Sequence, residues 1–277
     1  MKGLWQNPPK TLIVLLILSV ILNSFLWYQL ESSKAELDAT KNQLETVGEE
    51  QTEIINWYSD LRDQINIRLG QGQNASSFIT PDDPLIETKI QEIIDGPPKD
   101  TSEYWMDCFR IYCWVNSHIG YTMDTYTPVL PGATNDSLKW RPDFWRMPTE
   151  TLNDGVGDCE DIAVLLASML KNYTEGKSDI WVLGIKTSDP DPTGHVAVVL
   201  PVEGNELAIL DPYGGYCTWD YQQDEFIFDN ATVAINKWIS YWAESMPDAE
   251  VFEVFSDQFH HYFSSTGGFI NWATQRK

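Results

Sequence analysis

Basic side chains are scarce in this sequence. Lys and Arg number 18 against 41 Asp and Glu among 277 residues, which gives a formal net charge of −23 at pH 7. Nucleic acids require basic protein surfaces because they carry a dense array of phosphates, so no nucleic-acid partner is expected. No glycine-rich loop that would cradle a phosphate is present, and the 4 histidines include no pair at the spacing of zinc ligands. Nucleotide-dependent and zinc-dependent chemistry therefore has no support in the sequence.

Cysteine is also sparse, with 4 residues in the chain. Cys108 and Cys113 would point to different sides of one helix, so a disulfide between them is not expected. A bridge from one of these two residues to Cys217 remains open. Cys159 lies in a different setting and is considered below.

Apolar residues, by contrast, are plentiful. They make up 43% of the chain, which is enough for the core of one sizeable domain with accessory segments. The longest apolar run covers residues 12–30. As a helix it would span about 28 Å, close to the ~30 Å thickness of the hydrocarbon layer. We therefore predict a transmembrane helix over 12–30, with a cleaved signal peptide as the alternative.

The flanking charges predict the orientation of this helix. Lys2 and Lys10 precede it, whereas the residues that follow are more acidic. The positive-inside bias places residues 1–11 in the cytoplasm and the rest of this single-pass cell-membrane protein outside. Asn-x-Ser/Thr sequons agree with an external location; they begin at Asn74, Asn135, Asn172 and Asn230.

A seven-residue repeat follows the apolar run, over residues 31–69. Leu37 and Leu44 belong to one seam of the repeat, and Val47 and Ile54 belong to the second. The pattern predicts a coiled-coil or helical stalk, through which copies of the chain could form a homo-oligomer. A single amphipathic helix folded back on the domain is the alternative.

The remainder divides into a linker and a domain. Residues 70–84 are rich in Gly, Ser, Pro and Asp and are predicted to be a linker. The domain covers 85–277, with a core at 85–216 and a C-terminal extension at 217–277. Helices are predicted over 85–94, 103–119, the run after Cys159 and 230–243, and strands over 180–186, 195–200 and 207–210. Helices followed by an antiparallel sheet make the fold class α+β.

Three residues in the domain have the types and the order of a thiol catalytic triad. Cys159 opens the most apolar helix, His195 starts a strand, and Asp211 ends the next strand. A thiol at a helix N-terminus lies at the positive end of the backbone dipole, which favours the thiolate. An imidazole could accept its proton and a carboxylate could orient the imidazole.

Each of these residues also has a purely structural interpretation. The cysteine could be an inert core thiol, the histidine a structural residue of the strand, and the aspartate a turn residue before proline. Their joint occurrence in this order favours the catalytic interpretation.

The sequence also resembles the transglutaminase-like superfamily. The resemblance is carried by FWRMPTETL at 144–152, GVGDCEDIAVLLASML at 155–170, GHVAVVL at 194–200 and LDPYGG at 210–215, together with YWMDCFRIYCWVNSHIGY at 104–121. It implies a papain-like fold, with a central helix packed on an antiparallel sheet, and a triad of Cys159, His195 and Asp211. In its residues, the GDCED element most resembles bacterial transglutaminase-like cysteine proteinases.

The resemblance also indicates a function. It implies a cysteine peptidase or amidase that acts on proteins or peptides through a thioester. A protein-crosslinking transglutaminase and a catalytically inactive surface module are the alternatives. The backbone N–H of Cys159 is one oxyanion donor, and Trp140 and Trp145 are candidates for a second.

No cofactor is required by this reading, although some such proteinases bind calcium beside the nucleophile. Asp158, Glu160 and Asp161 could supply oxygen ligands here. A simpler interpretation makes them partners of the helix cap and dipole.

Overall fold

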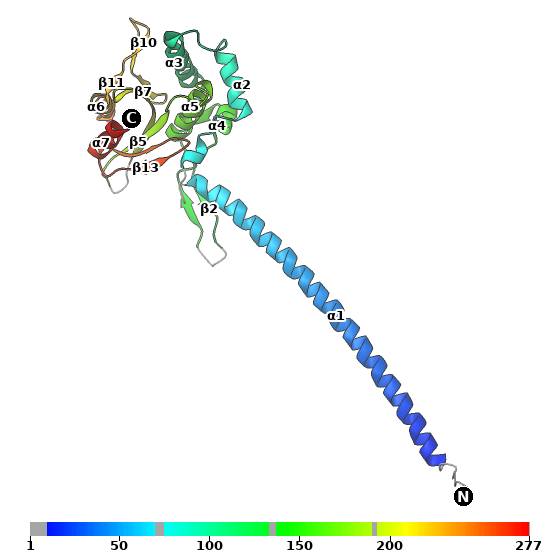
Figure 1. The fold of residues 1–277 in the computed structure, drawn as a ribbon. Coiled ribbons are helices and arrows are strands. Elements are labelled where there is room, and N and C mark those ends of the chain that lie inside the picture. The colour runs from blue at the N-terminus through cyan, green and yellow to red at the C-terminus, as the bar shows by residue number, and fades with distance from the viewer. Residues whose placement is uncertain (1–9, 70–74, 133–136, 190–192, 277) are drawn as a thin grey trace. The chain divides into compact units, whose positions relative to one another are not determined.

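The computed structural model describes residues 10–69, 75–132, 137–189 and 193–276. Contacts within the chain divide it into two units, Met1–Arg62 and Asp63–Lys277. Figure 1 shows the fold. We describe the two units separately.

The first unit consists, in its described part, of a single long helix. Helix α1 covers Lys10–Asn66 and has no buried residues. It includes the predicted membrane segment 12–30 and most of the predicted stalk without a break, and by length and composition it could cross a membrane. Most of the predicted cytoplasmic segment 1–11 lies outside the described residues.

The second unit contains helices and strands in the α+β arrangement that the sequence predicted. Its helices are η1 Ile67–Leu69, η2 Ala75–Phe78, α2 Pro84–Ile93, α3 Thr101–His118, α4 Pro148–Asp154, α5 Cys159–Tyr173, α6 Ala231–Trp242 and α7 Thr266–Gln275. Its short strands are β1 Gly120–Tyr121, β2 Thr127–Val129, β3 Lys139–Arg141, β4 Val156–Gly157, β8 Tyr216–Cys217, β9 Trp219–Asp220, β10 Glu225–Phe226 and β11 Asp229–Asn230. The longer strands are β5 Trp181–Lys186, β6 Gly194–Val202, β7 Glu206–Asp211, β12 Glu250–Phe255 and β13 His260–Tyr262.

An antiparallel sheet forms the centre of this unit. Its strands run in the order β11-β7-β6-β5-β12-β13, with β8 paired to the end of β7. Side chains alternate between its two faces, as the pleat of a strand requires. Val182 and Val198 pack in one core cluster with α2, α3 and α5, whereas Leu183 and Val199 pack in a second cluster with α6 and α7. Figure 1 shows these two helix groups on opposite sides of the sheet.

Helix α5 is the central element of the first cluster. Residues Ile162–Leu170 are all at most 2% exposed, which agrees with their apolar composition on every side of the helix. Because α5 is enclosed, its first residue, Cys159, has a fixed position at the edge of the core.

Two parts of the predicted domain organisation differ from the structure. Residues 70–84 were expected to form a linker, but Ala75, Phe78 and Ile79 are at most 4% exposed and belong to the core cluster of the second unit. Burying three apolar side chains stabilises the fold more than leaving them in a solvated linker. The first part of the predicted linker, residues 70–74, lies outside the described residues.

The C-terminal extension 217–277 also contains strands that the sequence analysis did not predict. Strands β12 and β13 extend the main sheet beyond β5, and α7 packs against β12. Aromatic residues dominate this extension, so it lacks the alternating pattern that would have revealed its strands.

The sequons can be placed only in part. Asn74 and Asn135 lie outside the described residues. The side-chain amide of Asn172 donates to the Pro81 carbonyl, and the Asn230 side chain caps α6.

The exposed seam of α1 generates a test of the predicted oligomer. Leu37 and Leu44 are 68% and 72% exposed in the single chain, so association would remove both from water. We expect residues 31–277 to sediment as an oligomer and the double variant Leu37→Lys, Leu44→Lys to sediment as a monomer. The control variant Ala39→Lys, Thr46→Lys adds the same charge outside the seam. Monomeric wild-type protein would contradict the stalk prediction.

Candidate active site

His195 and Asp211 form a buried pair at the ends of two neighbouring strands of the main sheet. His195 lies at the start of β6 and Asp211 at the end of the neighbouring antiparallel strand β7. The Nε2 atom of His195 donates to Oδ2 of Asp211 at 2.8 Å. Their side chains are 4% and 0% exposed. The structure therefore brings together two of the three residues that were predicted from the sequence. Because Nε2 is bonded to Asp211, Nδ1 is the ring nitrogen that is left for another partner.

The Asp211 carboxylate receives three further hydrogen bonds. Oδ2 accepts from the indole N–H groups of Trp238 and Trp242, both at 2.9 Å, and Oδ1 accepts from the backbone N–H of Gly214 at 2.7 Å. A buried carboxylate is costly unless such donors satisfy it. The four donors to Asp211 hold both of its oxygens in place.

The two tryptophans are functional residues that the sequence analysis missed. They lie four positions apart on α6, so both indoles reach the same side of the helix. The helix itself was predicted, but it lies beyond residue 216, where the resemblance ended. The i, i+4 pair of Trp residues on that helix was the available signal.

Gly214 is required by the same arrangement. A Cβ atom added there would lie 2.5 Å from Oδ2 of Asp211 and 2.5 Å from Cζ2 of Trp242. No side chain fits at this distance, so glycine allows the backbone N–H to approach the carboxylate.

Cys159 is the first residue of α5, and Asp158 is its N-cap. The thiol donates to Oε2 of Glu160 at 3.3 Å. Among the described residues, the thiol makes no hydrogen bond to His195. Burial raises the pKa of Cys159 well above its usual value, and the negative charges of Glu160 and Asp158 raise it further. The expected thiolate is therefore disfavoured here, because burial and two nearby carboxylates outweigh the helix dipole.

Two tyrosines connect the Cys159 side of the site with the His195 side. Tyr121 in β1 pairs with Gly157, two residues before Cys159, and Tyr213 follows Asp211 in the chain. Their rings stack with centroids 3.9 Å apart, and the Tyr213 ring lies 5.8 Å from that of His195. The pKa of Tyr121 is raised to about 12 by burial and, next, by Cys159. The two stacked rings thus lie between β1, which pairs with the segment before Cys159, and His195.

A cluster of carboxylates lies beside the thiol. Ligand oxygens of Asp124, Asp158 and Glu160 lie within 4.8 Å of one another. Oδ1 of Asp158 and Oε1 of Glu160 are buried and have no hydrogen-bond partner among the described residues. Burial and, next, Asp158 raise the pKa of Glu160 well above its usual range and that of Asp124 to about 6. Crowded, unpartnered oxygen atoms fit a hard divalent cation such as Ca²⁺.

This cluster differs from the set that the sequence suggested. Asp161 was expected with Asp158 and Glu160, but its Oδ1 accepts from the backbone N–H of Arg146 at 2.7 Å and its Oδ2 from that of Asp158 at 3.4 Å. Asp161 thus accepts backbone hydrogen bonds at the start of α5, as the cap interpretation proposed. Asp124 is the third carboxylate of the cluster in its place.

Neither tryptophan proposed as a second oxyanion donor makes a hydrogen bond to Cys159 among the described residues. Trp145 packs between Phe78 and Phe255, with ring centroids at 5.1 and 5.7 Å. Trp140 is 54% exposed on β3. The backbone N–H of Cys159, at the first position of α5, stays a prediction as an oxyanion donor.

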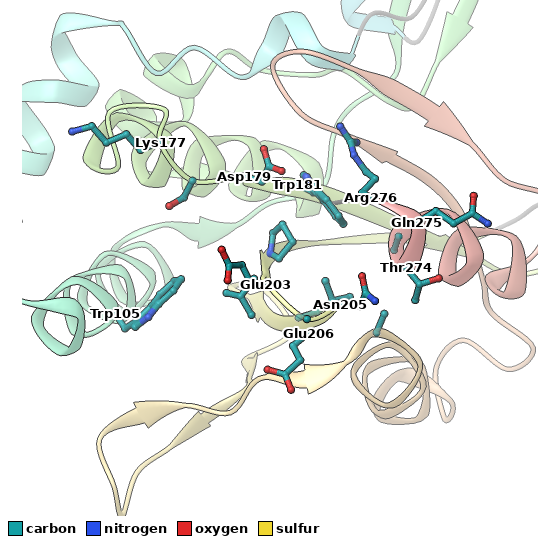
Figure 2. Close-up of a pocket in the computed structure, with 17 residues that line it drawn as sticks. Trp105, Lys177, Asp179, Trp181, Glu203, Asn205, Glu206, Thr274, Gln275 and Arg276 are labelled. Atoms are coloured by element: carbon teal, nitrogen blue, oxygen red, sulfur yellow. The ribbon is translucent and has the colours of Figure 1, made fainter.

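A separate pocket of about 1120 Å³ opens at the turn between β6 and β7. Figure 2 shows Trp105, Glu203 and Arg276 around it. Cys159, His195 and Asp211 are not among its lining residues, so this pocket is distinct from the candidate active site.

Comparison with known proteins identifies the domain type. Residues 90–240 match the family model described as a transglutaminase-like domain. EGTA-treated LapG of Legionella pneumophila is 18% identical, covering 68% of this chain and 88% of its own, with a TM-score of 0.38. Calcium-bound LapG is 18% identical over 65% and 88%, with a TM-score of 0.33. A putative cysteine protease from Cytophaga hutchinsonii is 13% identical over 68% and 50%, with a TM-score of 0.32. No curated protein matches the chain.

The carboxylate cluster and the adjacent Asp161 together predict how stability depends on pH. The folded-state pKa of Asp161 is raised to about 8 by burial and Asp158, and that of Asp124 to about 6, above the unfolded value of about 3.9. A raised carboxyl pKa contributes stability that is complete below pH ~4 and is lost as the pH rises through the folded value. We expect the Tm, measured in EDTA, to fall between pH 4 and 8.

Two variants separate this effect from general charge repulsion. Asp124→Asn should flatten the decline between pH 4 and 6 and raise the Tm at pH 7.5. Glu244→Gln, at an exposed position, removes one charge elsewhere and should leave the slope unchanged. Equal slopes in all three proteins would refute the assignment to this cluster.

The contact between Gly214 and Asp211 gives a second prediction. Gly214→Ala should lower the free energy of unfolding by about 1–3 kcal/mol, because the new methyl group must displace Asp211 or Trp242. The control is Gly267→Ala, where the nearest atom to an added Cβ is 3.9 Å away. Urea unfolding measures both; a neutral Gly214→Ala would show that the carboxylate site is not tightly constrained.

Proposed function

Since the chain belongs to the transglutaminase-like domain family, we propose that it is a thiol enzyme that hydrolyses peptide or amide bonds in protein or peptide substrates. Cys159 is the nucleophile, His195 the general base and acid, and Asp211 the residue that orients His195. The observation that carries the proposal is the buried His195–Asp211 hydrogen bond at 2.8 Å, with its three additional donors to the carboxylate.

The proposed reaction proceeds in two steps. Nδ1 of His195 accepts the thiol proton, and the sulfur of Cys159 attacks the carbonyl carbon of the substrate. The imidazolium returns the proton to the leaving amine, and a thioester remains on Cys159. Water, deprotonated by the same imidazole, then releases the acid and restores the thiol. The backbone N–H of Cys159 is aimed at the oxyanion in both steps.

Asp211 contributes by holding one tautomer of the imidazole. Its hydrogen bond occupies Nε2, so Nδ1 remains the nitrogen that can accept a proton. The carboxylate also stabilises the imidazolium formed during each step. Trp238 and Trp242 are positioning residues, because their indoles fix the carboxylate rather than contact the substrate.

The thiol must leave Glu160 before it can react. In the described arrangement its proton is directed at a carboxylate that raises its pKa. Asp124, Asp158 and Glu160 would hold a divalent cation, whose charge would neutralise the carboxylates beside the thiol. Glu160 would then no longer oppose ionisation of Cys159, and the thiol could turn toward His195.

The same observation favours a second candidate function. A thiol hydrogen-bonded to Glu160 and not to His195 is also what a catalytically inactive module would have. Such a module would use the domain surface for binding and would keep the three residues for their structural roles.

We further propose that α1 anchors the domain at the cell membrane. Its apolar segment follows Lys10 and precedes more acidic sequence, which supports an N-terminus in the cytoplasm and a catalytic domain outside.

Turnover of a peptide library, with and without a primary amine, tests the enzymatic proposal. Wild-type protein should cleave peptides, and Cys159→Ala should lose at least about 10³-fold in rate because no thioester can form. Amine incorporation that outpaces cleavage would show a transferase instead. No turnover by folded wild-type protein, with Ca²⁺ supplied, would favour the inactive module.

Calcium titration tests the carboxylate cluster independently of turnover. Millimolar Ca²⁺ should raise the Tm in proportion to RT ln(1 + [Ca²⁺]/Kd), about 2.7 kcal/mol at one hundred times Kd, and EGTA should reverse the rise. Asp158→Asn should abolish the shift, whereas Glu244→Gln should retain it. A rise that persists in Asp158→Asn would place the cation elsewhere.

A further inference from the structure

Cys217 faces helix α3 from the end of the main sheet. It pairs with Leu210 in β7, and both side chains pack with the core cluster that contains α3. Its neighbour Tyr216 packs with the cluster on the opposite face. This alternation fixes the direction of the Cys217 side chain.

Contacts from α3 lie on both sides of Cys217 along the chain. The Phe109 ring stacks on Trp219 at 4.0 Å with an interplanar angle of 1°. The side-chain amide of Asn116 donates to the carbonyl of Pro212. The helix surface between these two contacts therefore faces the residues between 212 and 219, which include Cys217.

Cys113 lies on that part of the helix surface. It is four positions after Phe109 and three before Asn116, so the three side chains are neighbours on one side of α3. Burial raises the pKa of the Cys217 thiol, and the nearby Cys113 raises it further. The pKa of Tyr221 is raised by burial and then by both cysteines. These effects on Cys217 and Tyr221 agree with the placement of Cys113 close to Cys217 that the helix contacts indicate.

The other two cysteines are not available in the same way. Cys108 is 0% exposed in the core, and Cys159 is in the candidate active site. Cys113 is exposed and Cys217 is partly buried. An oxidant from solution would thus reach Cys113 first.

We propose that Cys113 and Cys217 form a disulfide when the protein meets a thiol–disulfide oxidant, and that this bond joins α3 to strand β8, which pairs with the end of β7 where Asp211 lies. In the first step the Cys113 thiolate attacks a sulfur of the oxidant and releases one thiol. In the second step the Cys217 thiolate attacks the Cys113 sulfur of the mixed disulfide and releases the second thiol. The protein pair loses two electrons and two protons, and both appear on the two released thiols.

The disulfide would restrict the movement of the candidate active site, although neither cysteine belongs to that site. Cys217 in β8 pairs beside the end of β7, where Asp211 lies, and Tyr213 is in the turn between these strands. A cross-link between residues roughly 100 positions apart removes much of the freedom of the unfolded chain. The proposal does not depend on catalysis, so it can hold or fail independently of the proposed function.

Peptide mapping after oxidation with glutathione disulfide tests the proposal on the full chain in detergent. Trypsin places each cysteine in its own peptide, at 100–110, 111–139, 147–171 and 187–237. We expect a species that joins 111–139 to 187–237, together with a loss of two of the four free thiols. The Tm should rise by roughly 5 °C on oxidation.

Cys113→Ser is the decisive variant because its position is exposed and tolerates a hydroxyl group. It should match the reduced wild type in Tm and should gain no stability from glutathione disulfide, while Cys108→Ser should still form the cross-link. A stable glutathione adduct on Cys113, or a disulfide between two chains, would overturn the proposal.

Discussion

The fully buried carboxylate of Asp211 is the constraint on which the candidate active site depends. A carboxylate that is shielded from water must receive its hydrogen bonds from the protein. Here four N–H groups donate them. The donors come from β6, from the turn after β7 and from α6. Those segments therefore have to meet at one point, and the meeting point positions His195.

The carboxylates on the two sides of the site differ in their hydrogen-bond donors. Asp211 has donors for both oxygens, so its charge is stabilised and can support an imidazolium. Asp158 and Glu160 each have a buried oxygen without a partner, so their charges are disfavoured and in turn disfavour the thiolate of Cys159. In the proposed mechanism the base is thus in place while the Cys159 thiol is restrained, and a proton or a cation on the carboxylates would release the thiol.

Much of this fold could be predicted from sequence because its main elements carry simple periodic patterns. The predicted helices and strands between residues 85 and 243 correspond to α2, α3, α5, α6 and β5–β7, and the family match confirms the resemblance. The pairing of His195 with Asp211 follows from two adjacent antiparallel strands whose ends were correctly located.

The remainder depends on long-range contacts that no local pattern encodes. Trp238 and Trp242 resemble ordinary core aromatics until α6 is known to lie beside Asp211. Likewise, the thiolate expected from the helix dipole is opposed by burial and by Glu160 and Asp158, and Asp124 joins these two carboxylates only through folding. The sequence could predict candidates for the reacting groups, but it could not reveal the hydrogen bonds and the charges that surround them.

The account rests on the claim that His195 promotes ionisation of Cys159, and one measurement tests that claim most directly. The rate of Cys159 alkylation by a haloacetamide should be followed against pH, with Ca²⁺ present, in the wild type and in His195→Gln. The account predicts that Cys159 reacts at lower pH than the other three cysteines and that His195→Gln moves this reaction to higher pH. Coincident profiles for the two proteins would contradict it.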